Sequence, residues 1–301
     1  MAFRTAELLN LSAYGFDIAV APLAGGGIAR LDWHGKPVLR PAVEGAVAAR
    51  DPLGLSSFPM TPYASRIVDG AFEWGDVSTQ IPPNMTGGAH PLHGIGWHTP
   101  WSVIAEDERS IEIALVHDGD TNWPWAFESR QRFNLYEDHV EVHLSVTSRD
   151  PRPFPSSLGP HPYFFSDGAE IQFDAAQLWE ISGEALPSHL ARPAVVDHLA
   201  EGVAATSLDL DHCFEGWNGR ARIKWAEHGV EVGAAVLVGD TPCPCTRLQL
   251  YTPPQAGFFC LEPVTARGVS FTAANPYELG VVELVDQTLT IITTLTPFRV
   301  G

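Results

Sequence analysis

Positively charged residues are scarce in this sequence of 301 residues, which has 18 Lys+Arg against 36 Asp+Glu and a formal net charge of −18. A protein that binds nucleic acid neutralises phosphates with a basic stripe, and no such stripe is visible. The same acidity disfavours an anionic membrane surface and mainly favours solubility. The charge balance therefore predicts no nucleic acid and no membrane among the partners.

Cysteine and long apolar runs are also rare. The cysteines are Cys213, Cys243, Cys245 and Cys260. They indicate no disulfide framework and a reducing compartment, so we expect a cytoplasmic protein. The "CPC" segment lacks the spacing and the second pair of a zinc ribbon, so we expect no metal there. No apolar run approaches the ~18 residues of a membrane span, and the start of the chain lacks the pattern of a secretory signal.

Helical periodicity is scarce as well, and short runs rich in β-branched and aromatic residues take its place. Several runs, such as "SIEIALVHD" and "HVEVHLSVTSR", alternate apolar and polar side chains, and Gly and Pro separate them at short intervals. The segment "FNLYEDHVEVHL" predicts a hairpin that turns near Glu137 and Asp138, with every second residue from Val140 to Val146 on one face.

This pattern predicts the fold class. We expect one all-β domain over residues 1–301, built as a large sandwich of antiparallel sheets. Two stretches rich in polar residues or proline, 76–101 and 182–218, are typical of long connections. Connections of that length in a compact domain tend to be functional.

One histidine stands in an unusual setting, in the segment "SSLGPHPYFF" at residues 156–165. Pro160 and Pro162 fix the backbone on both sides of His161 and keep it out of the helical region. The imidazole therefore lies on a stiff segment that suits either a group aimed at a ligand or a plain buried turn.

A carboxylate also stands in an apolar setting. Glu262 follows "GFFCL" and precedes Pro263, so burial will demand a partner or shift its pKa. A Glu with a raised pKa is a candidate general base, and a constrained His161 a candidate general acid.

Other polar residues near glycines and prolines are weaker candidates when each is taken alone. Arg66 is by default a surface charge, and His93 has the reading of an ordinary loop histidine as well as that of a ligand. Trp97 is more often a core residue than a ligand platform. Asp211 in "LDLDHCFEGWNG" completes the set.

Five segments carry these residues in chain order: "YASRI", "HPLHGIGW", "GPHPYF", "LDHCFEGW" and "CLEPVT". Together they resemble the motifs of the aldose 1-epimerases, also called galactose mutarotases, and most closely the bacterial branch. The likeness covers nearly the whole chain. It implies a β-supersandwich that binds a sugar across one open face and interconverts α and β anomers of an aldose.

The resemblance also implies roles for single residues. Glu262 matches the general base and His161 the general acid, which would begin protonated with help from nearby carboxylates. Arg66, His93 and Asp211 match residues that hold the sugar. A sixth residue, matched less firmly as an apolar wall, is Trp97. The implied chemistry needs no metal and no organic cofactor, and the implied partner is a small-molecule sugar, with monomer or homodimer both open.

Three alternatives stay open at this point. The first is a mutarotase for a sugar with an acidic group at C6, such as a sugar phosphate or a sulfoquinovose-like sugar; a neutral aldose is favoured because the motifs supply one cation, Arg66. The second is a carbohydrate-binding protein without catalysis. The third is a glycoside hydrolase that uses Glu262 and Asp211 as its two carboxyl groups.

Overall fold

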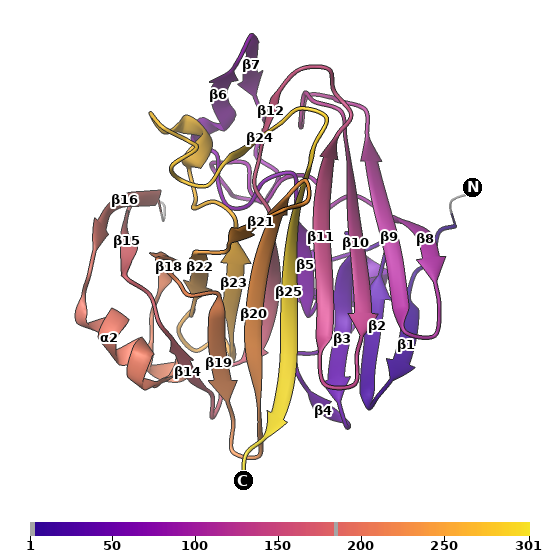
Figure 1. Cartoon of the computed structure of the whole chain (residues 1–301), viewed down its shortest axis with the longest axis vertical. Helices are drawn as coiled ribbons and strands as arrows, with labels where there is room; N and C mark the ends of the chain where they lie inside the picture. Colours follow the sequence, from indigo (N-terminus) through magenta and orange to yellow (C-terminus); the bar gives the residue numbers. More distant parts are fainter. Residues whose placement is uncertain (1–3, 184–185) are drawn as a thin grey trace.

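Two large antiparallel sheets carry most of the chain in the computed structural model, which describes residues 4–183 and 186–301 (Figure 1). Sheet I is ordered β1 (Leu9–Ala13), β2 (Phe16–Ala21), β3 (Gly27–Trp33), β5 (Ser57–Met60), β13 (Gly159–Phe165), β23 (Phe258–Val264), β22 (Arg247–Tyr251), β18 (Asp211–Glu215), β15 (Gln177–Ser182) and β16 (Leu186–Ala191), with β4 (Lys36–Pro37) on β3. The predicted all-β fold with antiparallel sheets is confirmed.

Sheet II contains the long strands that run side by side across the middle of Figure 1. Its order is β17 (Val203–Ala204), β14 (Glu170–Phe173), β19 (Arg220–Lys224), β20 (His228–Val238), β25 (Thr288–Arg299), β11 (Val140–Ser148), β10 (Phe127–Leu135), β9 (Ser110–His117) and β8 (Ser102–Glu106), with β21 (Thr241–Pro244) on β20.

Short elements complete the described part of the chain. They are the pair β6 (Ala71–Trp74) and β7 (Val77–Gln80), the pair β12 (Phe154–Ser156) and β24 (Val282–Leu284), the helices α1 (Ala46–Ala49) and α2 (Ala194–Glu201), and the 3₁₀ turns η1 (Pro52–Gly54), η2 (Val68–Gly70), η3 (Ala205–Ser207) and η4 (Ser270–Thr272). Within residues 4–183 and 186–301, no helix has the length and apolar character needed to cross a membrane.

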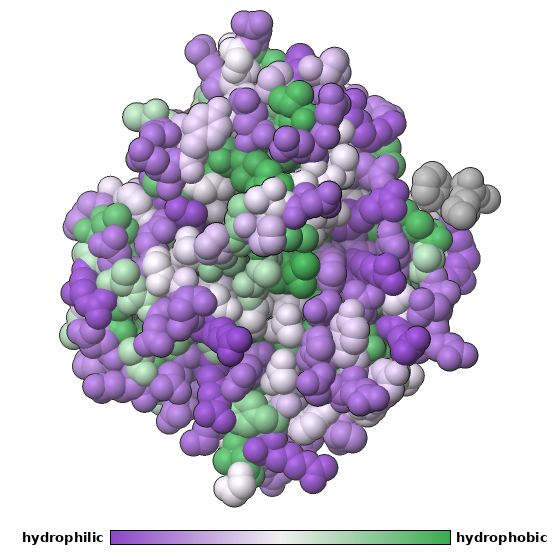
Figure 2. Space-filling view, in the orientation of Figure 1, coloured by the Kyte–Doolittle hydropathy of each residue, from purple (hydrophilic) through white to green (hydrophobic). Residues whose placement is uncertain are grey.

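Alternation along the strands produces the core between the sheets. The predicted hairpin is confirmed as β10 and β11, in which Leu135 lies opposite Val140. Val140, Val142 and the next two alternate residues of β11 are buried, as the pattern predicts, while the residues between them are partly exposed. Figure 2 shows that hydrophilic side chains cover most of the face in view and that apolar ones gather in small patches.

The two predicted long connections differ in the structure. Residues 81–101 form neither helix nor strand and approach other segments through isolated bridges, so most of the first connection is confirmed. The second expectation is wrong, because 182–218 contains β16, α2 and β18. Polar and proline residues hid this regularity, because β16 is a largely exposed edge strand, α2 is short, and only part of β18 is buried.

The two faces of sheet I pack in different surroundings. In β23, Phe259 and Leu261 point into the main core, whereas Phe258, Cys260 and Glu262 alternate onto the other face. That other face carries the candidate site, and the loops between β5 and β8 approach it.

Candidate functional site

The register of three neighbouring strands places the candidate catalytic residues in one row. Tyr163 of β13 lies opposite Cys260 of β23, so two residues further along the same antiparallel register His161 lies opposite Glu262. Gln249 of β22 is the partner of Glu262 on its other side. Because side chains two residues apart share a face, all five side chains project from the same side of sheet I.

The two prolines explain how His161 is held. Pro160 and Pro162 have no backbone N–H, and β13 pairs with β5 along this part and with β23 only from Tyr163 onward. On β5, Phe58 lies opposite His161, and their rings stack with centroids 4.4 Å apart and an interplanar angle of 21°. Backbone and ring stacking together fix the direction of the imidazole.

His161 and Glu262 form a buried pair. Nε2 of His161 lies 3.4 Å from Oε1 of Glu262, and the residues are 8% and 3% exposed. Burial raises the pKa of Glu262 well above its usual value, and the charge of Asp211 adds to this. Burial lowers the pKa of His161 to about 3, and Arg40 acts in the same direction. Burial therefore favours the neutral forms of both side chains, with the shared titratable proton on Glu262. This direction runs against the expectation that His161 begins protonated, because desolvation acts more strongly than the neighbouring carboxylates.

A polar cluster lines the same cavity as the pair and consists of Asp211 on β18, Gln249 on β22 and Arg66 in a loop. Nε2 of Gln249 donates to Oδ1 of Asp211 at 2.7 Å, and Nη2 of Arg66 lies 3.9 Å from Oδ2. Burial raises the pKa of Asp211, while Arg66 and the hydrogen bond from Gln249 lower it. The wide gap to Arg66 leaves Oδ2 able to accept a hydroxyl hydrogen. Sequence reasoning did not place Gln249; its only signal was an amide within the strand "RLQLY".

His93 is oriented by a reciprocal backbone contact with Ser65. The N–H of Ser65 donates to Nδ1 of His93 at 3.0 Å, and the N–H of His93 donates to the carbonyl of Ser65 at 2.9 Å. The backbone of this loop is strained, because φ is positive at both residues, 58° at His93 and 66° at Ser65. Since Nδ1 accepts, Nε2 carries the hydrogen. Burial, followed by His161 and Arg66, lowers the pKa of His93 well below its usual value, which makes it a neutral donor.

Trp97 lies behind the wall of the site rather than on it. Its side chain is fully buried, stacks on Phe58 at 5.1 Å, and donates from Nε1 to the carbonyls of Leu92 and Gly94 at 3.2 and 3.1 Å. The prediction of Trp97 as an apolar wall is corrected to a support, because Phe58 stands between it and the site. It holds the loop that carries His93.

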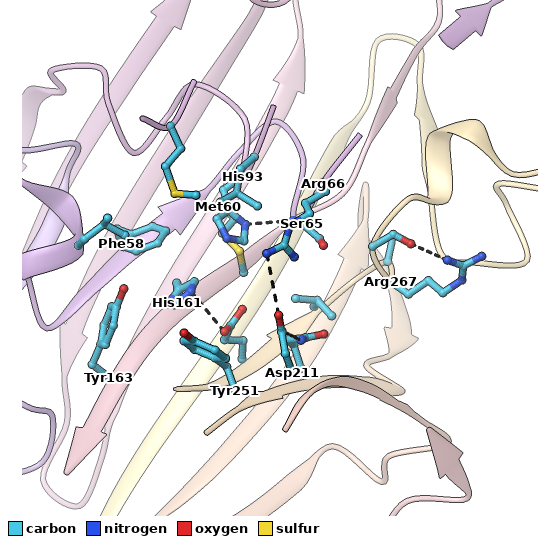
Figure 3. Close-up of a pocket in the computed structure, with 18 of the residues that line it drawn as sticks. Phe58, Met60, Ser65, Arg66, His93, His161, Tyr163, Asp211, Tyr251 and Arg267 are labelled. Atoms are coloured by element: carbon cyan, nitrogen blue, oxygen red, sulfur yellow. Dashed lines mark hydrogen bonds and ion pairs between the residues drawn. The ribbon is translucent and has the colours of Figure 1, made fainter. Parts of the chain in front are cut away.

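These residues line one cavity of about 460 Å³, to which both members of the pair contribute (Figure 3). The structure thus brings Arg66, His93, His161, Asp211 and Glu262 to the same cavity. Apolar and amide side chains that sequence reasoning missed also line it, among them Phe58, Met60, Leu92, Tyr163, Gln249, Tyr251, Phe258 and Val264.

Two further arginines differ in position: Arg267 lines the cavity, and Arg247 does not. Arg267 points away from the pair in Figure 3, stacks on Trp179 at 4.1 Å, and donates from Nη1 to the carbonyl of Gly268 at 2.6 Å. Arg247 donates from Nε to Glu215 at 2.9 Å. Neither guanidinium is directed at the catalytic pair.

Arg40 lies over the rings of Tyr163 and Phe258, 4.2 and 5.0 Å from their centroids, and is not part of the cavity lining. Among the described residues, Arg66 is therefore the cation that lines the cavity beside Asp211.

Comparison with known proteins gives a consistent family. The sequence pattern of the family described as aldose 1-epimerase matches residues 15–274. The uncharacterized protein YphB of Escherichia coli (strain K12) is 29% identical over 249 residues, which cover 80% of this chain and 82% of YphB.

Solved structures share the fold. A putative aldose 1-epimerase from Escherichia coli K12 superposes with a TM-score of 0.85 at 24% identity, covering 97% of this chain and 99% of that one. A galactose mutarotase-like protein from Clostridium acetobutylicum gives 0.83 at 16% identity, covering 99% and 98%. Galactose 1-epimerase from Lactobacillus acidophilus NCFM gives 0.77 at 16% identity, covering 100% and 99%.

Proposed function

Since this chain belongs to the aldose 1-epimerase family, we propose that it interconverts the α and β anomers of a neutral aldose by acid–base ring opening and closure. The observation that carries the proposal is the buried pair of His161 and Glu262, 3.4 Å apart in the lining of a cavity. An acid and a base side by side meet the requirement of the reaction, which moves one proton off a hydroxyl and one onto the ring oxygen.

In the proposed reaction, the two side chains of the pair supply and accept all the protons that move. The carboxylate of Glu262 takes the proton of the C1 hydroxyl, the imidazolium of His161 gives a proton to the ring oxygen, and the C1–O5 bond breaks to leave an open-chain aldehyde. Rotation about C1–C2 and closure return both protons. The active form, carboxylate beside imidazolium, holds the same single proton as the neutral pair, so moving that proton from Oε1 to Nε2 produces it without exchange with solvent.

The surrounding groups suit a sugar's hydroxyls. Asp211 accepts, while Gln249 and Arg66 position it. The neutral Nε2–H of His93 donates, and apolar side chains such as Met60 and Tyr251 line the same cavity. Hydroxyls that have matching donors and acceptors fix the sugar with C1 over the pair, and such positioning contributes to the rate in addition to the acid and base.

A neutral substrate is favoured over an anionic one by the arginines. A C6 phosphate or sulfonate needs a fork of guanidinium or ammonium donors. Arg247 is paired with Glu215, and Arg267 stacks on Trp179 while pointing away. Arg40 donates to the carbonyls of Leu53 and Leu55 and lies over the ring of Tyr163. This leaves Arg66, itself 3.9 Å from Asp211. A lone guanidinium already facing a carboxylate is poorly suited to bind an acidic group in addition to hydroxyls.

Exchange NMR or polarimetry over a panel of freshly dissolved pure anomers tests the proposal. We expect at least one neutral aldohexose to equilibrate faster with the protein than in buffer alone, with no change in composition other than the anomer ratio. Binding of sugars without acceleration would favour the carbohydrate-binding alternative. Release of a chromophore from an aryl glycoside would favour the hydrolase alternative instead.

A further inference from the structure

A buried cysteine stands beside the catalytic pair, and the proposed reaction makes no use of it. Cys260 is fully buried, and it shares a face with Glu262 because the two are separated by one residue on β23. Its opposite residue on β13 is Tyr163, which puts the thiol on the diagonal from His161. Among the residues that the structure describes, His161, Cys260 and Glu262 are the one group of three potential metal ligands whose ligand atoms all lie within 4.8 Å of one another.

The spacing of this trio matches a small divalent cation. Zinc bonds of about 2.0–2.3 Å to nitrogen, oxygen and sulfur in a tetrahedral arrangement put neighbouring ligand atoms about 3.3–3.8 Å apart. The 3.4 Å between His161 Nε2 and Glu262 Oε1 already equals one such edge, and it is long for a hydrogen bond. The thiol lies within 4.8 Å of both other ligand atoms, so it has to approach by at most about 1 Å to reach such an edge.

We propose that His161, Cys260 and Glu262 form a binding site for a thiophilic divalent cation such as Zn²⁺, which enters through the sugar cavity and inhibits the protein by occupying the pair. Because His161 and Glu262 line the cavity, we place the fourth position of the tetrahedron on the cavity side, where water or a buffer anion completes it. The inhibition rests on the proposed function; the binding does not.

The ligand set determines which cations are expected. Thiolate and imidazole favour Zn²⁺ and Co²⁺, whereas Mg²⁺ and Ca²⁺ require a shell of oxygen ligands that this trio does not offer. Nδ1 of His161 has no hydrogen-bond partner in the described part of the chain, although a histidine that ligates a metal normally donates its other ring N–H. Without that support the cation is expected to bind reversibly and to be removed by a chelator, as suits an inhibitory site.

Binding is tested with Co²⁺ as the probe, because a cobalt–thiolate bond gives a charge-transfer absorption band in the near ultraviolet. We expect the band in the wild-type protein and in the control Cys243→Ser, whose cysteine is partly exposed on β21. Cys260→Ser and Cys260→Ala should lose it and should bind Co²⁺ at least tenfold more weakly. Absence of the band from the wild type, or its persistence in either Cys260 variant, would overturn the site, and the first result is independent of whether the variants fold.

Inhibition is tested with Zn²⁺ in the anomerisation assay. The wild type, Cys243→Ser and the two Cys260 variants are each compared with their own metal-free rate. We expect Zn²⁺ to lower the wild-type rate at least tenfold in competition with sugar, EDTA to restore it, and Mg²⁺ to have no effect. A rate unchanged at Zn²⁺ concentrations that displace Co²⁺ from the thiolate would refute the placement of the cation on the pair. A thiolate band in a protein that accelerates no sugar's anomerisation would instead count against the proposed function and leave the metal site standing.

Discussion

Replacing His161 by Asn separates a catalytic imidazole from a structural one, because the two roles predict different results in rate and in acid stability. Asn keeps a polar side chain of smaller size but neither titrates near neutrality nor donates a proton to a ring oxygen. If His161 is the general acid, the anomerisation rate per folded molecule should fall about 10²- to 10⁴-fold. The control His143→Asn, on β11 of sheet II beside Glu141, should keep the rate.

The effect on stability follows from the lowered pKa. The unfolded chain takes up a proton on His161 below about pH 6.5, whereas the folded protein keeps the ring neutral until about pH 3. The stabilisation is therefore complete above pH 6.5 and is lost as the pH falls. At pH 5 the unfolded state is favoured by roughly 1.5 pH units times 1.4 kcal/mol, or about 2 kcal/mol, compared with pH 7.5.

His161→Asn removes that acid sensitivity. Between pH 7.5 and pH 5, the free energy of unfolding measured in urea should fall by about 2 kcal/mol more in the wild type than in the variant. A variant that keeps near-native turnover per folded molecule would refute the acid assignment. An equal loss of stability in both proteins would refute the claim that the folded site keeps the imidazole neutral.

Three further results are expected. Glu262→Gln should lower the anomerisation rate by about 10²-fold or more. Because burial raises the pKa of Glu262, the folded wild type keeps a proton that the unfolded chain loses, so the wild type loses stability as the pH rises. The variant should therefore gain stability relative to the wild type between pH 5 and pH 8 in urea unfolding. A variant with full turnover would remove Glu262 from the mechanism. Activity in polarimetry should survive exhaustive chelation, since the proton transfers need no Lewis acid, and a loss that zinc restores would contradict this. Finally, kcat/KM for a neutral aldohexose should exceed that for its C6-phosphate and C6-sulfonate analogues; an anionic sugar that wins by more than tenfold would make Arg267 and Arg247 the first residues to replace.

Local pattern was enough to predict the fold class and parts of the site. Period-two alternation from Val140 to Val146 predicted both the hairpin and its buried face, because strand geometry places alternate side chains on opposite faces whatever the rest of the chain does. The proline pair around His161 and the apolar run before Glu262 likewise act through their own backbone and immediate neighbours. The roles assigned to these two residues stay predictions.

Only the tertiary structure decided what stands next to what. The register of β13, β23 and β22 sets His161 against Glu262 and Gln249, and it brings Cys260 to the same face. The pairing of β13 with β23 joins segments about a hundred residues apart, which no local pattern encodes. The lowered pKa of His161 and the position of Trp97 behind Phe58 also depend on the tertiary structure. Desolvation and side-chain contacts are set by the packed surroundings, and a residue's neighbours in the sequence do not determine them.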